Sequence, residues 1–370
     1  MMTRASVAVI RTSPETVLQD YERLMELAGL RTHLDSSAVT ILKAVVSRFF
    51  PFPGANTTPW QLEGAIRTLQ RAGYRDLGYI QVDVRQIDRF TDPDLNGYQP
   101  ILCAAAVTIY RRRDLRWVHY KPRRPLLILD RLCEQGISVP EILLGANVVH
   151  LPTIKGDRTT RIAGAIRSAG DGLLSFCHQP VIPLAPELLI DLLAVQQEIL
   201  AGVFAVMDGT TAGDGAGPRQ LRPEVKNALL ASADPVALDA VAARLMGLDP
   251  LRDLGYVRLA HERGLGVGDV RAIALVGDVD LARENWRFNL GGGSTGILHR
   301  LLRSWPLASV ACTDARMPLM RLLERALELY DGCYRWPARD RQVFEGWLRG
   351  TRWGQLFQRY QRLHILSQGP

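Results

Sequence analysis

The sequence predicts a three-layer α/β fold, in which helices cover both faces of a mostly parallel sheet, followed by a helical C-terminal extension. Strand-like apolar runs alternate with helix-like segments along most of the 370 residues, as is typical of α/β proteins. Glycine ends several of the helix-like segments, and threonine or proline begins them. Later in the chain only helical patterns continue, and tryptophan and arginine become frequent. We therefore expect an α/β domain over residues 1–280 and a helical extension over residues 281–370.

The first strand–helix–strand unit is expected near the N-terminus. The β-branched run 40–47 predicts a strand, and residues 60–73 carry apolar side chains at helical spacing up to a terminal glycine. Thr57 or Thr58 is expected to cap this helix, with a proline in its first turn. The next strand is expected at 77–84, so the unit predicts a parallel pair with a right-handed crossover.

The same alternation continues through the middle of the chain. Residues 125–132 are compatible with either a strand or a helix. The aspartates at 208 and 234 are expected at strand ends, where α/β proteins carry their ligands. Further strands are expected at 101–110 and 115–120 as a pair, and at 142–152, 203–209, 228–235 and 271–278. Further helices are expected at 159–170, 186–202 and 235–247.

The basic composition is explained mainly by arginine. Of 45 Lys and Arg residues, four are lysines and therefore 41 are arginines, and the net charge is +7. Only residues 111–116 and 121–124 form dense basic segments, so we regard nucleic acid as an unlikely partner. Because arginine is the default cation here, each lysine indicates a position that requires a compact, titratable amine. The lysines are Lys43, Lys121, Lys155 and Lys226.

Several classes of protein lack support in the sequence. The five cysteines form no Cys-x-x-Cys pair, which excludes a zinc ribbon and a ferredoxin-type cluster by spacing. Nucleotide-binding G-x-x-x-x-G-K-[ST], dinucleotide-binding G-x-G-x-x-G and the hydrolase G-x-S-x-G motif are absent. No apolar run is long enough for a membrane helix, and the N-terminal run is too short for a signal peptide. We therefore expect a cytoplasmic protein with no membrane partner.

The segment 150–161, HLPTIKGDRTTR, predicts an anion site. It places Lys155 and Arg161 after an apolar run, and Arg167 follows on the next expected helix. Cationic side chains near exposed helix amides favour a carboxylate or a phosphate. A solvated surface turn is the alternative interpretation of the same residues.

A set of carboxylates follows the later strands. Asp208 and Asp214 belong to a glycine-rich loop expected over residues 208–219, which also contains Gly217, and the two carboxylates are expected to face one pocket. Asp234 is expected to cap the helix that begins at Pro235. Capping does not explain Asp239, which is expected to pair with Lys43 or Lys155 or to act chemically. His178 is a further candidate for the site.

These motifs together resemble the family called domain of unknown function 362, over roughly residues 38–278. The resemblance rests on Lys43, Pro152 to Lys155, Gly164 to Arg167, Asp208-Gly209, Gly217-Pro218 and Ser232 to Asp239. This chain reads Lys-Ala-Val, Lys-Gly-Asp and Arg-Ser where family members usually have Lys-Pro-Asn, Lys-Thr-His and Lys-Asn. It also lacks the ferredoxin-like cysteine cluster of many members. The resemblance implies a fold and a site without implying a reaction.

We therefore expect an enzyme that acts on a small anionic substrate by lyase-, isomerase- or cyclase-type acid–base chemistry, without an organic cofactor. A role in specialised metabolism would fit that chemistry. The expected catalytic residues are Lys155, Lys43, Asp239 and Asp208. The expected substrate-binding residues are Arg161, Arg167, Asp214, Gly217, His178 and Asp234.

Two alternatives stay open at this point. The first is a metal-dependent enzyme that binds a divalent ion through Asp208, Asp214 and Asp239, because carboxylate oxygens suit such ions. The second is a non-catalytic protein that binds nucleic acid or an acidic partner through the two basic segments, with steep salt dependence.

Overall fold

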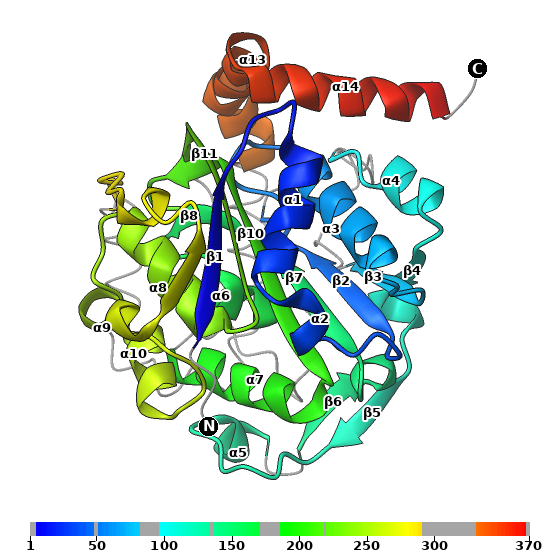
Figure 1. Ribbon diagram of the computed structural model, residues 1–370, viewed down its shortest axis with the longest axis vertical. Helices are drawn as coiled ribbons and strands as arrows, with labels where there is room; N and C mark the ends of the chain where they lie inside the picture. Colours follow the sequence, from blue (N-terminus) through cyan, green and yellow to red (C-terminus); the bar gives the residue numbers. More distant parts are fainter. Residues whose placement is uncertain are drawn as a thin grey trace.

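One large, mostly parallel sheet forms the centre of the molecule (Figure 1). The computed structural model describes residues 5–47, 51–81, 96–133, 136–170, 186–217, 220–290 and 331–367. Within these residues the sheet has ten strands, and its main path runs β12-β1-β11-β10-β7-β2-β3-β4, with β8 paired to β10 and β9 paired to β8. The strands are β1 (Ser6–Arg11), β2 (Thr40–Ala44), β3 (Leu77–Gln81), β4 (Thr108–Arg111), β7 (Asn147–Leu151), β8 (Thr153–Asp157), β9 (Arg161–Ile162), β10 (Gly202–Asp214), β11 (Arg222–Ser232) and β12 (Ala274–Gly277).

Strand β11 runs in the opposite direction to the other strands of the main path, so it ends at the opposite edge of the sheet. On the main path β11 is the strand that runs antiparallel to its neighbours, β1 and β10, whereas β2, β3, β4, β7 and β10 run parallel to one another. The parallel strands therefore end at one edge, which we call the carboxyl edge, and β11 ends at the opposite edge. A separate two-stranded sheet consists of β5 (Trp117–Tyr120) and β6 (Ile137–Pro140).

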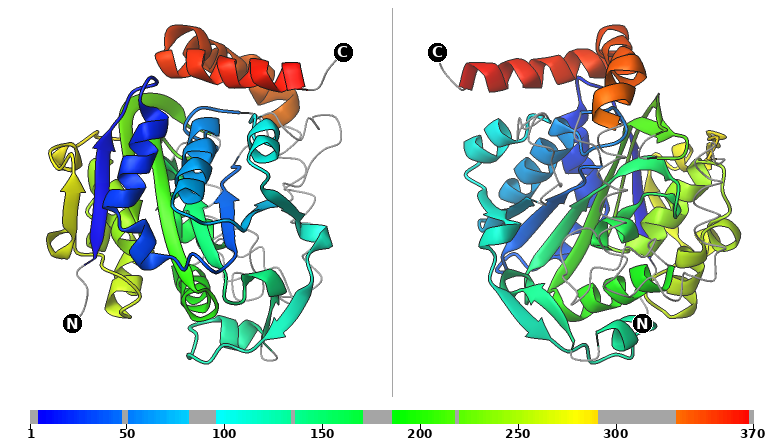
Figure 2. Two further views of the ribbon diagram at one scale, coloured as in Figure 1. Left: turned by 45° about the vertical axis from the view of Figure 1, so that its right-hand side comes forward. Right: turned by 180° about the vertical axis from the view of Figure 1, so that it is seen from behind.

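Helices cover both faces of the large sheet, so the predicted three-layer arrangement is confirmed (Figures 1 and 2). One face carries α1 (Val17–Leu27), α2 (Leu30–His33), α3 (Pro59–Arg71) and α4 (Gln99–Ala104). The other carries α6 (Ala165–Gly170), α7 (Pro186–Ile199), α8 (Pro235–Leu245) and α10 (Gly255–Glu262), with the short helices α5 (Leu129–Leu132) and α9 (Pro250–Asp253) nearby. None of the described helices is both long and apolar enough to cross a bilayer.

The helical C-terminal region lies across the carboxyl edge (Figures 1 and 2). A π-helical segment (Asp331–Asp340) leads into α13 (Arg341–Gly350) and α14 (Arg352–Ser367). Trp353 packs against Trp60 of α3 in a tilted arrangement, with 5.3 Å between ring centroids, and donates a 2.7 Å hydrogen bond to Asn227. Trp347 donates to the hydroxyl of Thr211 on β10 at 3.1 Å. The described part of the C-terminal extension is thus helical, as predicted, and it packs on the α/β body.

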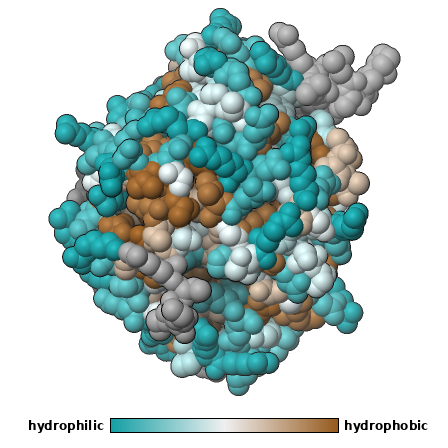
Figure 3. All heavy atoms as spheres, viewed as in Figure 1, coloured by the Kyte–Doolittle hydropathy of each residue, from teal (hydrophilic) through white to brown (hydrophobic). Residues whose placement is uncertain are grey.

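An apolar surface lies elsewhere, over the outer strand of the sheet. Figure 3 shows hydrophobic side chains gathered over β12 and the adjoining end of α1. Leu27, which is 41% exposed, and the partly buried Val276 contribute to it. This surface is separate from the carboxyl edge and its helical cover.

The predicted loop at 208–219 is wrong over its first half, because β10 runs through it to Asp214. Its glycines permit close contact between strands. A Cβ added at Gly209 would lie 2.7 Å from Ile154, and one at Gly213 would lie 3.0 Å from the Cβ of Lys155. The glycine-rich composition therefore reflects crowded strand packing as well as turn formation.

Two other predicted elements differ from the structure. The expected strand pair at 101–110 and 115–120 is absent, because its first residues belong to α4, β4 pairs with β3, and β5 pairs with β6. Pro100 in the first turn of α4 suits a helix start. The helix expected at 159–170 begins only at Ala165, because residues 161–162 pair with β8.

A glycine in α3 offers a test of how tightly α3 packs against α1. Gly64 lies where a Cβ would be 2.7–2.8 Å from the side chain of Tyr21 on α1. Gly64→Ala should lower the free energy of unfolding by about 1–3 kcal/mol through overpacking. Gly346→Ala in α13 is the matched control, since nothing lies within 4 Å of its added Cβ. We expect it to be neutral or stabilising, by up to roughly 1 kcal/mol. Urea denaturation of both variants checks this, and equal effects would contradict the packing argument.

Candidate active site at the carboxyl edge

Lys43 lies near the end of β2, directly beside His150 of β7 in the parallel register. Both side chains are fully buried. The ammonium group of Lys43 donates to the backbone carbonyl of Ser168 on α6, and its Nζ lies 3.3 Å from the Ser168 hydroxyl. That hydroxyl lies 3.3 Å from Nδ1 of His150, whose Nε2 lies 3.2 Å from Oε1 of Gln196 on α7. A chain of hydrogen bonds therefore links four side chains from β2, α6, β7 and α7.

The donors and acceptors in this series of hydrogen bonds can be assigned from the groups at its two ends, Gln196 and Lys43. The Gln196 oxygen only accepts, so Nε2 of His150 carries the hydrogen and Nδ1 accepts from Ser168. Ser168 Oγ can then accept from the ammonium of Lys43. Burial, followed by the charge of Lys43, lowers the pKa of His150 from 6.5 to about 3. His150 is therefore a neutral imidazole with one defined tautomer.

Lys155 lies on β8, beyond the point where Pro152 separates β7 from β8. Its side chain is only 2% exposed. The ammonium group donates to the carbonyl of Ala55 and to the hydroxyl of Thr153, the latter at 2.9 Å. Thr153 pairs with Asp208 of β10, and Lys155 pairs with Gly213 after a register shift. The lysine thus ends beneath the loop that precedes α3.

The loop before α3 is held firmly against the strand ends. Thr57 Oγ1 accepts from the amide of Val45 at 2.8 Å and donates to the carbonyl of Leu151 at 2.6 Å, which joins the ends of β2 and β7. The predicted cap at Thr58 is confirmed, and Gln61 completes a capping box with it. The C-terminal extension packs on the same loop through Trp336 and Val343, which contact the cluster of Phe52, Ala55 and Leu221.

Asp208 is a fully buried carboxylate with five hydrogen-bond donors. Tyr21, Thr58 and Trp60 donate to Oδ2 at 2.6, 2.9 and 3.0 Å, and the amide and hydroxyl of Thr210 donate to Oδ1. Burial raises the pKa of Asp208, and these donors oppose the shift. Its oxygens are well satisfied, so the arrangement suits anchoring α1 and α3 to β10.

The carboxylate of Asp239 is also bound by groups of the chain, namely two backbone amides and a tyrosine. Its expected pairing with a lysine is therefore wrong. Its carboxylate accepts from the amides of Ala165 and Ile166 at 2.6 and 3.2 Å, and Tyr256 donates at 3.3 Å. These amides begin α6 and have no partner within the helix. Gly164 makes the approach possible, because a Cβ there would lie 2.1 Å from the carboxylate. Burial raises the pKa of Asp239 from 3.8 to about 7 despite the amides and Tyr256.

The arginines of the predicted anion site are engaged within the chain. Arg167 forms an ion pair with the buried Asp157, whose other oxygen accepts from the amides that follow it. Arg161 lies 3.5 Å from Asp253 and is about half exposed. Arg167 is mostly buried, so an anion at that position would have to compete with Asp157.

The remaining predicted residues lie at separate places. Asp214, at the end of β10, contacts Arg222 at 3.0 Å and accepts from the amide of Asn289 at 2.6 Å. The carbonyl of Gly217 accepts from the amide of Arg158 at 3.2 Å. Asp234 caps α8, as predicted, but the antiparallel direction of β11 places it at the opposite edge of the sheet. His178 lies outside the described residues.

The described contacts do not join all these side chains in one cleft. Lys43 and Asp239 lie on the side of α6 and α8, whereas Lys155 and Asp208 lie on the side of α1 and α3. Asp208, Asp214 and Asp239 have different partners, and no group of three possible metal ligands occurs among the residues that the structure covers.

Sequence reasoning missed the neutral partners of the charged groups, namely Ser168, Gln196, Thr153, Tyr21 and Tyr256. The sequence contains only weak indications of these partners. Ser168 occupies a position where members of the family that the chain resembles usually have asparagine, and His150 is the first residue of the predicted anion segment. Uncharged hydroxyl and amide side chains are common throughout the chain and carry no spacing that marks them.

An open parallel sheet with buried lysines and aspartates at its carboxyl edge defines an α/β protein with a candidate ligand site at that edge. The chain belongs to the family described as "Domain of unknown function (DUF362)", whose model matches residues 41–244, more than half of its length. The resemblance noted in the sequence is thereby confirmed. No curated protein and no solved structure matches the chain.

Asp239 makes the stability dependent on pH. Its folded-state pKa, about 7, lies above the ordinary value of 3.8, so the protonated form stabilises the fold. This stabilisation is fully present below pH 3.8 and is lost as the pH rises through about 7. The free energy of unfolding of the unmodified protein, relative to Asp239→Asn, should fall across that window by about 1.4 kcal/mol per pKa unit.

Denaturant titrations over that pH range measure the difference. Asp269→Asn is the control, because hydrogen bonds from Arg271 lower the pKa of Asp269 to about 2 and its pH dependence lies below 3.8. A difference between the unmodified protein and Asp239→Asn that does not change with pH would contradict the assignment.

The His150 tautomer is open to direct measurement. In histidine-labelled protein, the ¹⁵N spectrum should show a neutral ring protonated at Nε2, with no titration near pH 6.5 because its pKa is lowered to about 3. His150→Gln assigns the signal, and exposed His119 supplies a solvent reference. A ring protonated at Nδ1, or a charged ring at neutral pH, would overturn the proposed direction of the hydrogen-bond chain.

Proposed function

We propose that this chain is an enzyme that acts on a small carboxylate or phosphate substrate by acid–base chemistry at the carboxyl edge of its sheet. The observation that carries the proposal is the burial of two lysines: Lys43 lies near the end of β2, and Lys155 lies on β8, just beyond the end of β7, the neighbour of β2. In open α/β sheets, ligands bind beyond the carboxyl ends of the strands.

The environment of each lysine favours an incoming anion. Each ammonium group donates to a backbone carbonyl and lies near a hydroxyl, on Ser168 for Lys43 and on Thr153 for Lys155. Neutral oxygens compensate for lost hydration less strongly than an anion does. A substrate carboxylate or phosphate near these ammonium groups would therefore gain a strong charge-assisted hydrogen bond.

The network around Lys43 supplies groups that can move or hold a proton. The ammonium group of Lys43 can give a proton to a substrate and take it back, while Ser168, which lies between this group and the neutral imidazole of His150, helps to hold the ammonium group in place. Asp239, on the same side of the sheet, titrates near neutral pH. Such groups suit proton abstraction and return next to a carboxylate, which is the chemistry of lyases, isomerases and cyclases. This chemistry requires no organic cofactor.

The two alternatives receive less support. A metal site from Asp208, Asp214 and Asp239 would require the three to leave their present partners. Binding of an acidic partner would use exposed cations of the basic segments, such as Arg111 and Arg124. Exposed arginines are expected in a chain with this composition, so their presence is weak support for binding.

Because the chain has four lysines, selective labelling gives a direct test. Lysine labelled with ¹³C at Cε should give four signals, which Lys→Met variants assign. Titration with inorganic phosphate should shift the Lys155 signal saturably, because its ammonium group would bind the anion. Lys155→Met should weaken phosphate binding by about tenfold or more while the protein stays folded.

Lys226→Met is the matched control, since Lys226 contacts Glu224, Trp286 and Phe288, away from the loop that precedes α3. It should leave phosphate binding unchanged, and exposed Lys121 should show only a weak, unsaturable shift. If neither Lys43 nor Lys155 responds to phosphate or to acetate, the proposed anion site is wrong.

A further inference from the structure

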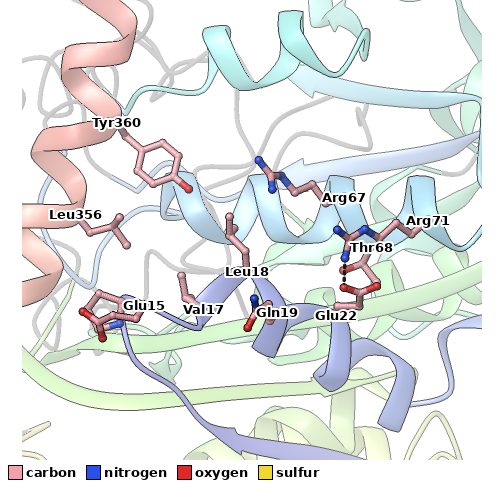
Figure 4. A pocket seen from close by; sticks show the side chains of 11 residues that line it. Glu15, Val17, Leu18, Gln19, Glu22, Arg67, Thr68, Arg71, Leu356 and Tyr360 are labelled. Atoms are coloured by element: carbon pink, nitrogen blue, oxygen red, sulfur yellow. Dashed lines mark hydrogen bonds and ion pairs between the residues drawn. The ribbon is translucent and has the colours of Figure 1, made fainter.

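A small cavity lies on the outer side of the C-terminal cover, where α14 crosses α1 and α3 (Figure 4). Its volume is about 230 Å³. Val17 and Leu18 of α1 and Leu356 of α14 supply apolar walls, and Arg67 and Arg71 of α3 line one side. The cavity is separate from the lysine sites described above, because neither Lys43 nor Lys155 lines it.

The arginines keep most of their hydrogen-bonding capacity. Arg67 contacts Glu63 at 2.5 Å through Nη2, and Arg71 contacts Glu22 through Nη1. Both side chains are more than half exposed. A guanidinium has five N–H donors, so each arginine can bind a second anion without losing its glutamate. The two arginines lie one turn apart on α3, which lets them approach one carboxylate together.

The opposite side of the cavity suits an apolar group. Tyr360 of α14 donates its hydroxyl to Glu63, which fixes the ring beside Leu356 and Leu18 in the view of Figure 4. The glutamates near the cavity already have cationic partners, since Glu15 contacts Arg352 and Glu22 contacts Arg71. The hydrogen-bonding groups that are still available to a ligand in this cavity are therefore mainly N–H donors.

We propose that this cavity binds a small amphipathic carboxylate, with its charged group at Arg67 and Arg71 and its apolar part between Leu18, Leu356 and Tyr360. The volume limits the occupant to a molecule of about ten to fifteen non-hydrogen atoms, far smaller than a typical drug-sized ligand. A bound molecule would join α14 to α1 and α3, and so strengthen the attachment of the C-terminal cover.

Calorimetric titration of the full chain with phenylacetate tests the site. We expect saturable binding, little binding of the uncharged 2-phenylethanol, and no binding of phenethylamine. Replacing both arginines by Arg67→Gln and Arg71→Gln should weaken phenylacetate binding by about tenfold or more. Leu356→Trp, which fills the cavity and keeps both arginines, should weaken it similarly.

Two controls separate this site from its alternatives. Arg258→Gln removes an exposed arginine of α10 that has a glutamate four residues away, and it should have no effect. In a Lys155→Met background, which removes the proposed anion site at the carboxyl edge, phenylacetate should still bind, and the Arg67→Gln and Arg71→Gln replacements should weaken that binding by about tenfold or more. The proposal is overturned if phenylacetate does not bind, if 2-phenylethanol binds equally well, or if both cavity variants bind normally. Loss of binding in Lys155→Met with normal binding in the cavity variants would place the ligand at the carboxyl edge instead.

Discussion

The burial of charge at one edge of the sheet is the constraint on which the rest of this structure depends. An ammonium or carboxylate group that leaves water must receive hydrogen-bond partners from the chain. Without them, its burial costs roughly several kcal/mol. Lys155 obtains its partners from Ala55 and Thr153, and Asp208 obtains five donors from α1, β10, and α3 with its capping residue Thr58. The loop before α3 therefore has to lie where it does. Its position is fixed by Thr57, which joins the ends of two strands.

The short helix α6 follows from the same constraint. A helix of six residues leaves most of its amides and carbonyls without partners inside the helix. Asp239 accepts from the amides at its beginning, and Lys43 donates to a carbonyl in its last turn. Both arrangements also match the helix dipole. These two charged residues belong to the motifs that carry the family resemblance, and here they hold one helix from both ends. A chemical role for Lys43 would thus be combined with a structural one.

Much of the fold could be predicted because it depends on local patterns. The capping threonine and Pro59 mark the start of α3, and Asp234 with Pro235 marks the start of α8. The direction of β11 could not be predicted, because an apolar run has no mark that distinguishes a parallel from an antiparallel neighbour. That direction moves Asp234 away from the carboxyl edge. The first strand, Ser6–Arg11, was not anticipated either, because its four buried residues form too short a run to stand out.

The partners of the buried charges were the least predictable part, since they come from distant segments. The contact between Asp239 and α6 spans 73 to 74 positions, and that between Tyr21 and Asp208 spans 187. The C-terminal cover extends this dependence further. Trp353 of α14 packs against Trp60, which donates to Asp208. Both α13 and α14 lie outside the region that matches the family. The family motif thus supplies the charged residues, while a segment outside it completes their enclosure. Members with a different C-terminal region would therefore need another way to shield the same carboxylate from water.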